Sequence, residues 1–362
     1  MNEIRKDKLR VLYVGNLGLM SKCTQRSWAI ERLGNDVHRL DTWPYEYGGN
    51  ALLWRIRLRT LKGRRINQLN QDVLTAAYNY RPDLVWFDKS IYIWPRTVAQ
   101  LRAAGFYTAH QIEDNPFGPR NDPGWAILRT ALPEYDLFLV PRKCNLDEYR
   151  KAGAKDVILL PFGYEPTLQF PPPAGWSDVN REYDVVYIGF PHDHRADFFL
   201  ELWKRHGVRT CIWGDPRWQR KFPRPTLPKE ARSELVMGSK VPYDKYRTIL
   251  WRARMCMSFV THSNQDEIGG RSLEITAAGA LLLAEDTPGH RKHFIDGEEA
   301  IFFESVADCA EKIKRYLPDE AARTKIAKAG QQRAISSGYS YDARIEPVLD
   351  YIRPRLSRRN IC

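Results

Sequence analysis

Short apolar runs alternate with amphipathic stretches along most of the chain. In the first half, runs that predict buried strands cover residues 9–15, 37–42, 84–87, 106–110, 137–140 and 157–161. Between them, apolar residues recur at helical spacing, as at Ile66, Leu69 and Val73, which share one helix face. Strands that alternate with helices in this way predict an α/β fold with a parallel, doubly wound sheet.

The same alternation begins again after a proline-rich segment. Residues 167–182 contain three consecutive prolines, which favour a stiff linker. Beyond this segment, further strands are predicted at 183–189, 208–214, 255–260, 280–284 and 300–303. We therefore expect two Rossmann-like domains, 1–166 and 183–339.

Residues 264–290 form the most informative segment of the chain. Ser272 is expected to cap a short helix, and Gly279 ends that helix before the apolar strand 280–284. Just upstream, 264–270 supplies two glycines and several polar side chains, and Arg271 follows. Backbone amides and an arginine at a helix N-terminus attract phosphate, so this helix end is a candidate phosphate site.

This segment resembles the donor-binding motif of GT-B glycosyltransferases, in which an acidic residue is followed eight positions later by a glutamate on a short helix. Asp266 and Glu274 have that spacing, although the first acid of the motif is usually Glu, and Gly269 matches its loop glycine. The variant it most resembles is the spore-maturation, CgeB-like group, which also places an arginine where Arg271 stands. The resemblance implies two Rossmann-like domains facing a central cleft, with a terminal helix, 340–362, that crosses back onto the first.

By this resemblance, the second domain would hold a nucleoside-diphosphate sugar as donor. Glu274 would accept hydrogen bonds from the ribose, or would alternatively complement the helix dipole, and Arg271 would neutralise the diphosphate. The other donor-side candidates, some of which have ordinary loop packing as an alternative, are Gly189, Arg195, Trp213, Gly214, Val241, Tyr243, Asn264, Gly269, Gly270 and Ser272.

The first domain would provide the acceptor side. Gly15, Asn16 and Gly18 follow the first predicted strand and form a candidate phosphate- or acceptor-side loop, at the edge where open α/β sheets bind ligands. For the base that takes the acceptor proton we expect Asp114, which resembles an acidic position of the CgeB-like group, and then His110. A turn formed by Asp-Asn-Pro at 114–116 is the alternative. Asp266 completes the catalytic candidates, as a contact to the sugar.

The net charge of +12 suits an anionic partner, such as a sugar nucleotide, a lipid phosphate, a membrane face or nucleic acid. Residues 51–65 hold six basic residues and no acid; they are either a solvated surface element or a contact to anionic lipid, a lipid-linked acceptor included. The six cysteines form no C-x-x-C pair, which favours reduced thiols in a cytoplasmic protein. Because no signal-peptide core or membrane span is evident, we expect a soluble protein, at most peripheral at the inner membrane face.

The sequence contains no D-x-D motif, so no essential metal is expected, and Arg271 with the helix dipole would offset the diphosphate. His192, Asp193 and His194 are expected to form a solvated turn instead of a metal site. The function expected is sugar transfer from a nucleotide sugar to an acceptor in polysaccharide, glycolipid or glycoprotein biosynthesis. The alternatives are a sugar-nucleotide epimerase of the same fold and a basic nucleic-acid-binding protein. No specific nucleic acid is expected, because no recognised nucleic-acid module is present.

Overall fold

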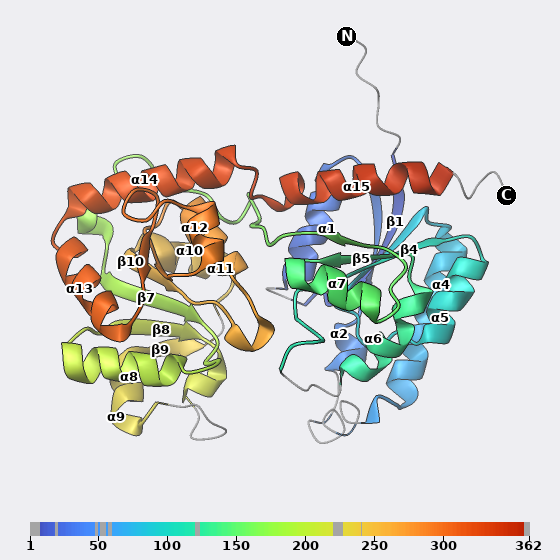
Figure 1. Ribbon diagram of the computed structural model, residues 1–362, viewed down its shortest axis with the longest axis horizontal. Helices are drawn as coiled ribbons and strands as arrows, with labels where there is room; N and C mark the ends of the chain where they lie inside the picture. The colour runs from blue at the N-terminus through green and yellow to red at the C-terminus, as the bar shows by residue number, and fades with distance from the viewer. Residues whose placement is uncertain are drawn as a thin grey trace, which may run out of the picture. The chain divides into compact units, whose positions relative to one another are not determined.

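The computed structural model describes residues 8–18, 21–47, 50, 56, 60–119, 124–219, 227–239 and 241–357. The chain divides into two compact units, Met1–Pro161 with Tyr341–Cys362, and Phe162–Ser340 (Figure 1). Within the described ranges, each unit is built on one six-stranded sheet, and all strand pairs are parallel. The prediction of an α/β fold with two doubly wound parallel sheets is therefore confirmed.

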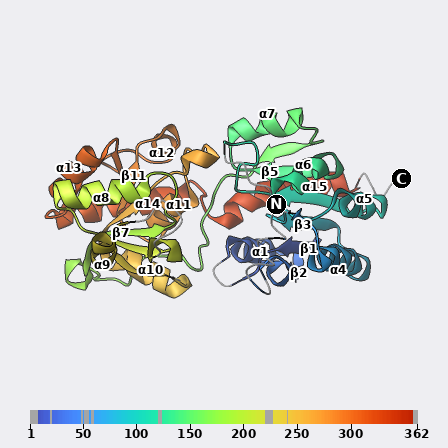
Figure 2. The ribbon, with the colours of Figure 1, turned by 90° about the horizontal axis from the view of Figure 1, so that it is seen from below.

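The first sheet has the strand order β2-β1-β3-β4-β5-β6, part of which can be followed in Figure 2. Its strands are β1 (Arg10–Gly15), β2 (Asp36–Asp41), β3 (Leu84–Asp88), β4 (Tyr107–Gln111), β5 (Leu137–Val140) and β6 (Val157–Leu159). The register pairs Gly15 with Asp88 and Asp88 with Gln111, so β1, β3 and β4 end at the same edge. Because the strand order reverses between β1 and β3, a ligand crevice is expected beyond their carboxyl ends.

Helices cover both faces of the first sheet. One face, with Val85, Phe87 and Phe138 in its core, carries α4 (Arg64–Tyr80), α5 (Pro95–Ala103), α6 (Trp125–Ala131) and α7 (Lys143–Lys151). The other face carries α1 (Lys22–Arg32) and α15 (Tyr341–Ser357), which lie side by side. Short elements complete the unit, namely α2 (Trp43–Glu46) and the 3-10 turn η1 (Leu132–Glu134). Helix α6 was not predicted, because seven residues are too few for a clear helical period.

The second sheet has the order β12-β11-β10-β7-β8-β9. Its strands are β7 (Tyr183–Gly189), β8 (Thr210–Gly214), β9 (Val236–Ser239), β10 (Ala253–Ser258), β11 (Leu282–Glu285) and β12 (Ile301–Phe303). Strand β9 was not predicted, because Val-Met-Gly-Ser is short and carries little β-branched or aromatic character. The strand order reverses between β7 and β10, which places the expected ligand crevice of this unit beyond Gly189 and Ser258.

The helices of the second unit again form two layers. One face carries α8 (Arg195–His206), α9 (Lys229–Leu235) and α13 (Val306–Tyr316). The other carries α10 (Tyr243–Trp251), α11 (Gly270–Ala277) and α12 (Pro288–His293), and α14 (Glu320–Ser336) packs against α11. The 3-10 turns are η2 (Asp178–Asn180), η3 (Pro216–Gln219) and η4 (His262–Asn264).

The segment predicted as a linker, 167–182, packs onto the second unit. The Trp176 indole donates to the Trp251 carbonyl at 2.9 Å, and the Trp251 indole donates to the Phe170 carbonyl at 3.0 Å. Asp178 forms ion pairs with Arg323 and Arg254. The chain therefore passes between the units at Pro161 and again at Ser340, and the three prolines lie on the surface of the second unit.

Candidate functional site

Arg195 joins the two loops that border the crevice of the second unit. It is the first residue of α8 and only 7% exposed. Its guanidinium donates to the Phe190 carbonyl after β7 at 3.2 Å and to the Val260 carbonyl after β10 at 2.7 Å. We expected this side chain to pair with a diphosphate, but both terminal nitrogens donate to the protein, and only the buried Nε has no hydrogen-bond partner among the described residues. Arg195 therefore shapes the crevice by holding its two loops together.

Two glycines let the loops after β7 and β8 pack closely. Gly214 has φ +122°, and a β-carbon there would lie 2.7 Å from the Gly189 carbonyl oxygen. A β-carbon on Gly189 would lie 2.4 Å from the Tyr187 hydroxyl. The structure thus gives both glycines a packing role, while diphosphate approach at Gly189 stays a prediction. Trp213 is buried against Tyr183, at 5.0 Å between ring centroids, so its ring belongs to the core and not to a base-binding surface.

Helix α11 begins at Gly270, with Gly269 as its N-cap, so the prediction of Ser272 as the cap is wrong. Ser272 is buried inside the helix, and its hydroxyl hydrogen-bonds the Ser258 hydroxyl at 2.9 Å and His290 Nε2 at 2.7 Å. Gly269 provides no side chain to cap the first amides, and the first turn holds no acidic residue. This helix end therefore presents backbone N–H groups and positive dipole to the preceding loop.

Glu274 and Tyr246, which are buried, form a cluster with the partly exposed Arg271 at the predicted donor motif. The Tyr246 hydroxyl donates to Glu274 Oε2 at 2.9 Å, and Arg271 Nη1 lies 3.5 Å from the same oxygen. The Arg271 guanidinium lies over the Tyr246 ring, 4.8 Å from its centroid. Burial raises the pKa of the Tyr246 hydroxyl. For Arg271, burial lowers the pKa, but the nearby Tyr246 and Glu274 raise it by more, so the pKa of Arg271 is raised overall. Glu274 is 4% exposed and lies in the middle of α11, so a helix-dipole role at the N-terminus is excluded.

The other predicted donor residues lie close in sequence to the helices that carry this cluster. Asn264 and Asp266 stand in a tight turn, where both amides donate to the Thr261 carbonyl and Gln265 is left-handed, with φ +57°. Val241 and Tyr243 precede and begin α10, the helix that carries Tyr246. The structure thus brings the start of α10 and the motif helix together through the contact between Tyr246 and Glu274.

The crevice of the first unit contains a buried ionic network that the sequence did not predict. Arg26, on α1 and 1% exposed, donates to both carboxylate oxygens of Asp88, at 2.7 and 2.9 Å. It also donates to Glu113 Oε1 at 2.8 Å, and the Tyr13 hydroxyl bonds Asp88. A buried charge is tolerated when its partners satisfy it, and here both Asp88 oxygens are bonded. The network fixes the carboxyl ends of β1 and β3 to the loop after β4.

Asp114 lies at the same edge, where it forms an ion pair with Lys89. Lys89 directly follows β3 in a left-handed conformation, with φ +55°. The negative charge of Asp114 raises the pKa of Lys89 above its ordinary value. The preceding residue, Glu113, accepts a hydrogen bond on its carbonyl from Arg142 at 2.6 Å, so the backbone next to Asp114 is fixed. Asp114 is partly exposed and remains a candidate base.

His110 lies in the core instead of at the sheet edge. Its side chain is fully buried among Phe87, Tyr135 and Phe138, at ring-centroid distances of 5.0 to 6.5 Å. Neither ring nitrogen is hydrogen-bonded within the described residues, and burial lowers its pKa to about 4. A neutral imidazole enclosed by three aromatic rings has no access to an acceptor, which argues against the predicted catalytic role.

The loop after β1 is held by hydrogen bonds to one side chain of its own and to one at the end of β2. Asn16 accepts from the Gly18 amide at 3.0 Å, and Asp41 accepts from the Leu17 amide at 2.8 Å. Near this edge lies Glu46 of α2, 9% exposed, whose Oε1 has no hydrogen-bond partner among the described residues. Burial raises the pKa of Glu46 to about 7. Nothing in the local sequence distinguishes this glutamate from a surface one, because its burial depends on how α2 folds over the sheet edge.

Across the described residues, no group of three or more His, Cys, Asp or Glu side chains is arranged to hold a metal ion. Nor does that part of the chain include a helix with the length and apolar character needed to cross a membrane. Within the basic segment 51–65, residues 51–55 and 57–59 lie outside the described residues.

Solved structures of low sequence identity share this architecture. Sucrose-phosphate synthase from Thermosynechococcus elongatus is 14% identical, with a TM-score of 0.69 over 96% of this chain and 100% of that chain. Anabaena HepE in complex with UDP and glucose is 11% identical, with a TM-score of 0.63 over 96% and 100%. Trehalose 6-phosphate synthase from Burkholderia multivorans is 10% identical, with a TM-score of 0.62 over 97% and 100%. The fold is that of the GT-B glycosyltransferases.

A family model described as glycosyl transferase-like matches residues 195–350. This range begins at α8, contains the Asp266 to Glu274 motif, and ends within α15. Among curated proteins, none matches the chain. Most of the matched range lies in the second unit, which is therefore similar to glycosyl transferase-like domains over that range.

Proposed function

We propose that the chain is a glycosyltransferase that takes a sugar from a nucleoside-diphosphate sugar bound on its second unit. The observation that carries this proposal is the cluster of Tyr246 on α10 with Glu274 and Arg271 on α11, within the range that matches the glycosyl transferase-like family. An acid oriented by a buried tyrosine and a cation beside uncapped amides are groups that bind a ribose and a diphosphate.

On the donor side, each group has a separate task. The Glu274 carboxylate accepts hydrogen bonds from the ribose hydroxyls, while Tyr246 holds it in one orientation. Arg271 and the amides at the start of α11 stabilise the diphosphate, on which negative charge develops as it leaves. Asp266, one turn before the helix, contacts the transferred sugar. Because HepE was solved with UDP and glucose, UDP is the first nucleotide to test.

On the acceptor side, we assign Asp114 as the base. An acceptor oxygen bonds to the anomeric carbon while the bond from that carbon to the diphosphate oxygen breaks. The bonding electrons leave with the nucleoside diphosphate, and the acceptor proton passes to the Asp114 carboxylate. Lys89 forms an ion pair with this carboxylate and so holds it at the carboxyl edge of the sheet.

The finer assignments belong to the same proposal. We place the protein close to the CgeB-like group, because Arg271 stands three residues before Glu274, and assign it to polysaccharide, glycolipid or glycoprotein assembly inside the cell. Transfer is proposed to need no metal, since Arg271 and the helix dipole offset the leaving diphosphate. Turnover should therefore persist in EDTA. Loss of turnover in EDTA, with recovery in Mn²⁺, would contradict this assignment.

Nucleotide binding by the intact protein tests the proposal. Calorimetry should show that UDP, or another base in a panel of GDP, dTDP and ADP, binds the wild type. Glu274→Gln should weaken that binding by about 1 to 3 kcal/mol, because the hydrogen bonds to a charged acceptor are lost. Glu311→Gln, at an exposed position of α13, is the matched control and should bind as the wild type does. A folded wild type that binds none of these nucleotides would overturn the proposed function.

A further inference from the structure

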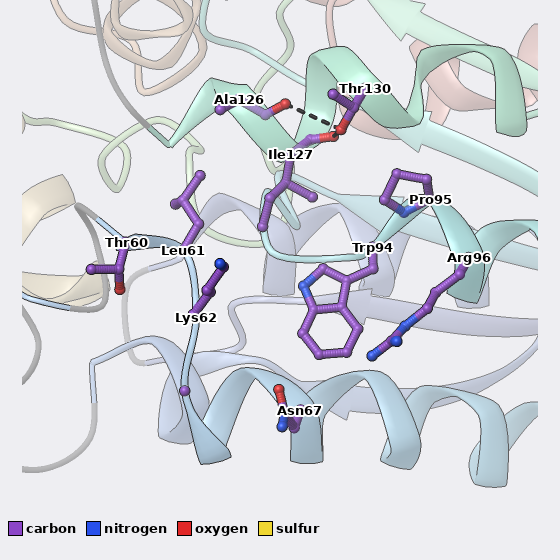
Figure 3. Close-up of a pocket in the computed structure, with 11 residues that line it drawn as sticks. Thr60, Leu61, Lys62, Asn67, Trp94, Pro95, Arg96, Ala126, Ile127 and Thr130 are labelled. Carbon is purple, nitrogen blue, oxygen red and sulfur yellow. Dashed lines mark hydrogen bonds between the residues drawn. The ribbon is translucent and has the colours of Figure 1, made fainter.

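The first unit contains a cavity of about 830 Å³ that is lined by none of the crevice residues described above. It lies between residues 60–63, the first turns of α4 and α5, and α6 (Figure 3). Its volume is in the range of small-molecule sites, about 300 to 1,000 Å³. In the chain, α4 precedes β3, α6 precedes β5, and α5 follows β3. In a parallel sheet such helices begin near the carboxyl ends of the strands, so the cavity lies near that edge of the sheet.

The walls of this cavity are mainly apolar. Figure 3 shows Ile127 pointing from α6 into the space between Leu61 and Trp94. Pro95 and Ala126 extend the same surface. Ile127 and Trp94 are only partly buried, so their apolar surface remains available to a ligand. Burial of such surface by an apolar chain is favourable, at about 25 cal/mol per Å².

Positive groups surround the apolar walls. Lys62 and Arg96 are exposed, and the Trp94 ring lies between them in Figure 3. The Arg96 guanidinium stacks over this ring, 4.1 Å from its centroid. Among the described residues, the cavity lining includes no acidic side chain, and the first turns of α4 and α5 contain none either. Two cations and two positive helix ends therefore meet an apolar surface, which is complementary to an amphiphilic anion.

We propose that this cavity binds the lipid-phosphate part of the acceptor: a single apolar chain packs against Trp94, Leu61 and Ile127, and its phosphate pairs with Lys62 and Arg96. The inference rests on the proposed function, because it treats the ligand as the acceptor of the sugar. Arginine and lysine suit a phosphate, and arginine contributes paired N–H donors. A nucleotide or a free phosphate would leave most of the apolar walls exposed to water.

Farnesyl phosphate below its critical micelle concentration is the probe, and calorimetry on the intact chain is the measurement. The double variant Lys62→Gln/Arg96→Gln should weaken binding at least tenfold. Ile127→Glu, which places a charge in the apolar wall at a partly exposed position, should do the same. The matched control is Arg150→Gln/Lys151→Gln, which removes one exposed arginine and one exposed lysine at the far end of α7 and should bind as the wild type does.

Two simpler probes separate the parts of the ligand. Farnesol should bind more weakly than farnesyl phosphate and should not respond to Lys62→Gln/Arg96→Gln, whereas inorganic phosphate should not displace farnesyl phosphate at equal concentration. Equal binding of farnesyl phosphate by wild type and both cavity variants would overturn the inference, as would its full displacement by inorganic phosphate or by UMP.

Nucleotide binding is measured on the same samples. A wild type that binds UDP but not farnesyl phosphate overturns this inference alone, and one that binds farnesyl phosphate but no nucleotide overturns the proposed function instead.

Discussion

Glu46 shows how burial changes the chemistry of a single residue. Its carboxylate is nearly enclosed, and burial raises its pKa from 4.5 to about 7, although Lys89 nearby acts in the opposite direction. Between pH 4.5 and 7 the folded protein therefore retains a proton that the unfolded chain has released. The stability that Glu46 contributes is fully present below pH 4.5 and is lost as the pH rises through 7.

Glu46→Gln should remove this pH dependence. At pH 5 the variant should be about as stable as the wild type, and at pH 8 it should be more stable by up to about 3 kcal/mol, since a shift of one pKa unit corresponds to about 1.4 kcal/mol. Urea unfolding at both pH values measures the difference. A stability gain that is the same at pH 5 and pH 8 would show that Glu46 does not titrate in this window.

His110 gives the opposite dependence. Burial lowers its pKa from 6.5 to about 4, so the folded state favours the neutral ring. Its contribution to stability is complete above pH 6.5 and is lost as the pH falls to 4. His110→Leu, which keeps an apolar side chain of similar size, should unfold at a lower pH than the wild type and should retain transfer activity. An acid transition at the wild-type pH, or complete loss of activity in a folded variant, would contradict this account.

At the scale of elements, the loops after β7 and β8 depend on the contact between Gly189 and Gly214. Gly214→Ala would place a β-carbon against the Gly189 backbone at a φ of +122°, which alanine rarely adopts. We expect a loss of about 2 kcal/mol or more in urea unfolding. Gly238→Ala on the neighbouring strand β9, where the nearest atom would be 3.7 Å away, is the control and should cost much less. Equal losses in the two variants would exclude a specific role for the Gly214 backbone.

At the scale of the whole molecule, the last helix belongs to the first unit. Ile345, Val348, Leu349 and Ile352 of α15 are buried in the same cluster as Val11 and Trp86. Leu349→Ala should therefore destabilise the first unit by about 2 to 5 kcal/mol. Hydrogen exchange should accelerate in β1 and β3 while β7 and nucleotide binding stay unchanged. Ile335→Ala, at an exposed apolar position of α14, is the control, and faster exchange in β7 than in β1 would contradict the assignment of α15.

The sequence by itself determined the periodic elements. The strands at 137–140 and 183–189 were predicted at their observed bounds, and the amphipathic pattern around Ile66 and Val73 predicted α4. These features depend on side chains a few residues apart, which the order of residues shows directly. The segment 264–279 was recognised for the same reason, because the spacing of Asp266, Glu274 and Gly279 lies within a single loop and helix.

Only the tertiary structure decided which side chains meet and which are enclosed. Arg26 and Asp88 are 62 positions apart, and Tyr246 and Glu274 are 28 apart, so neither pair leaves a local pattern. The local sequence did not show that Glu46 is buried, nor that the His110 ring, at the end of a predicted strand, is enclosed by aromatic side chains. The sequence predicted Ser272 as the N-cap of α11, but the N-cap is Gly269. The Ser272 hydroxyl instead hydrogen-bonds Ser258 and His290 in the interior. Local periodicity sets the elements, whereas burial and long-range pairing set the charge, orientation and access of each functional group.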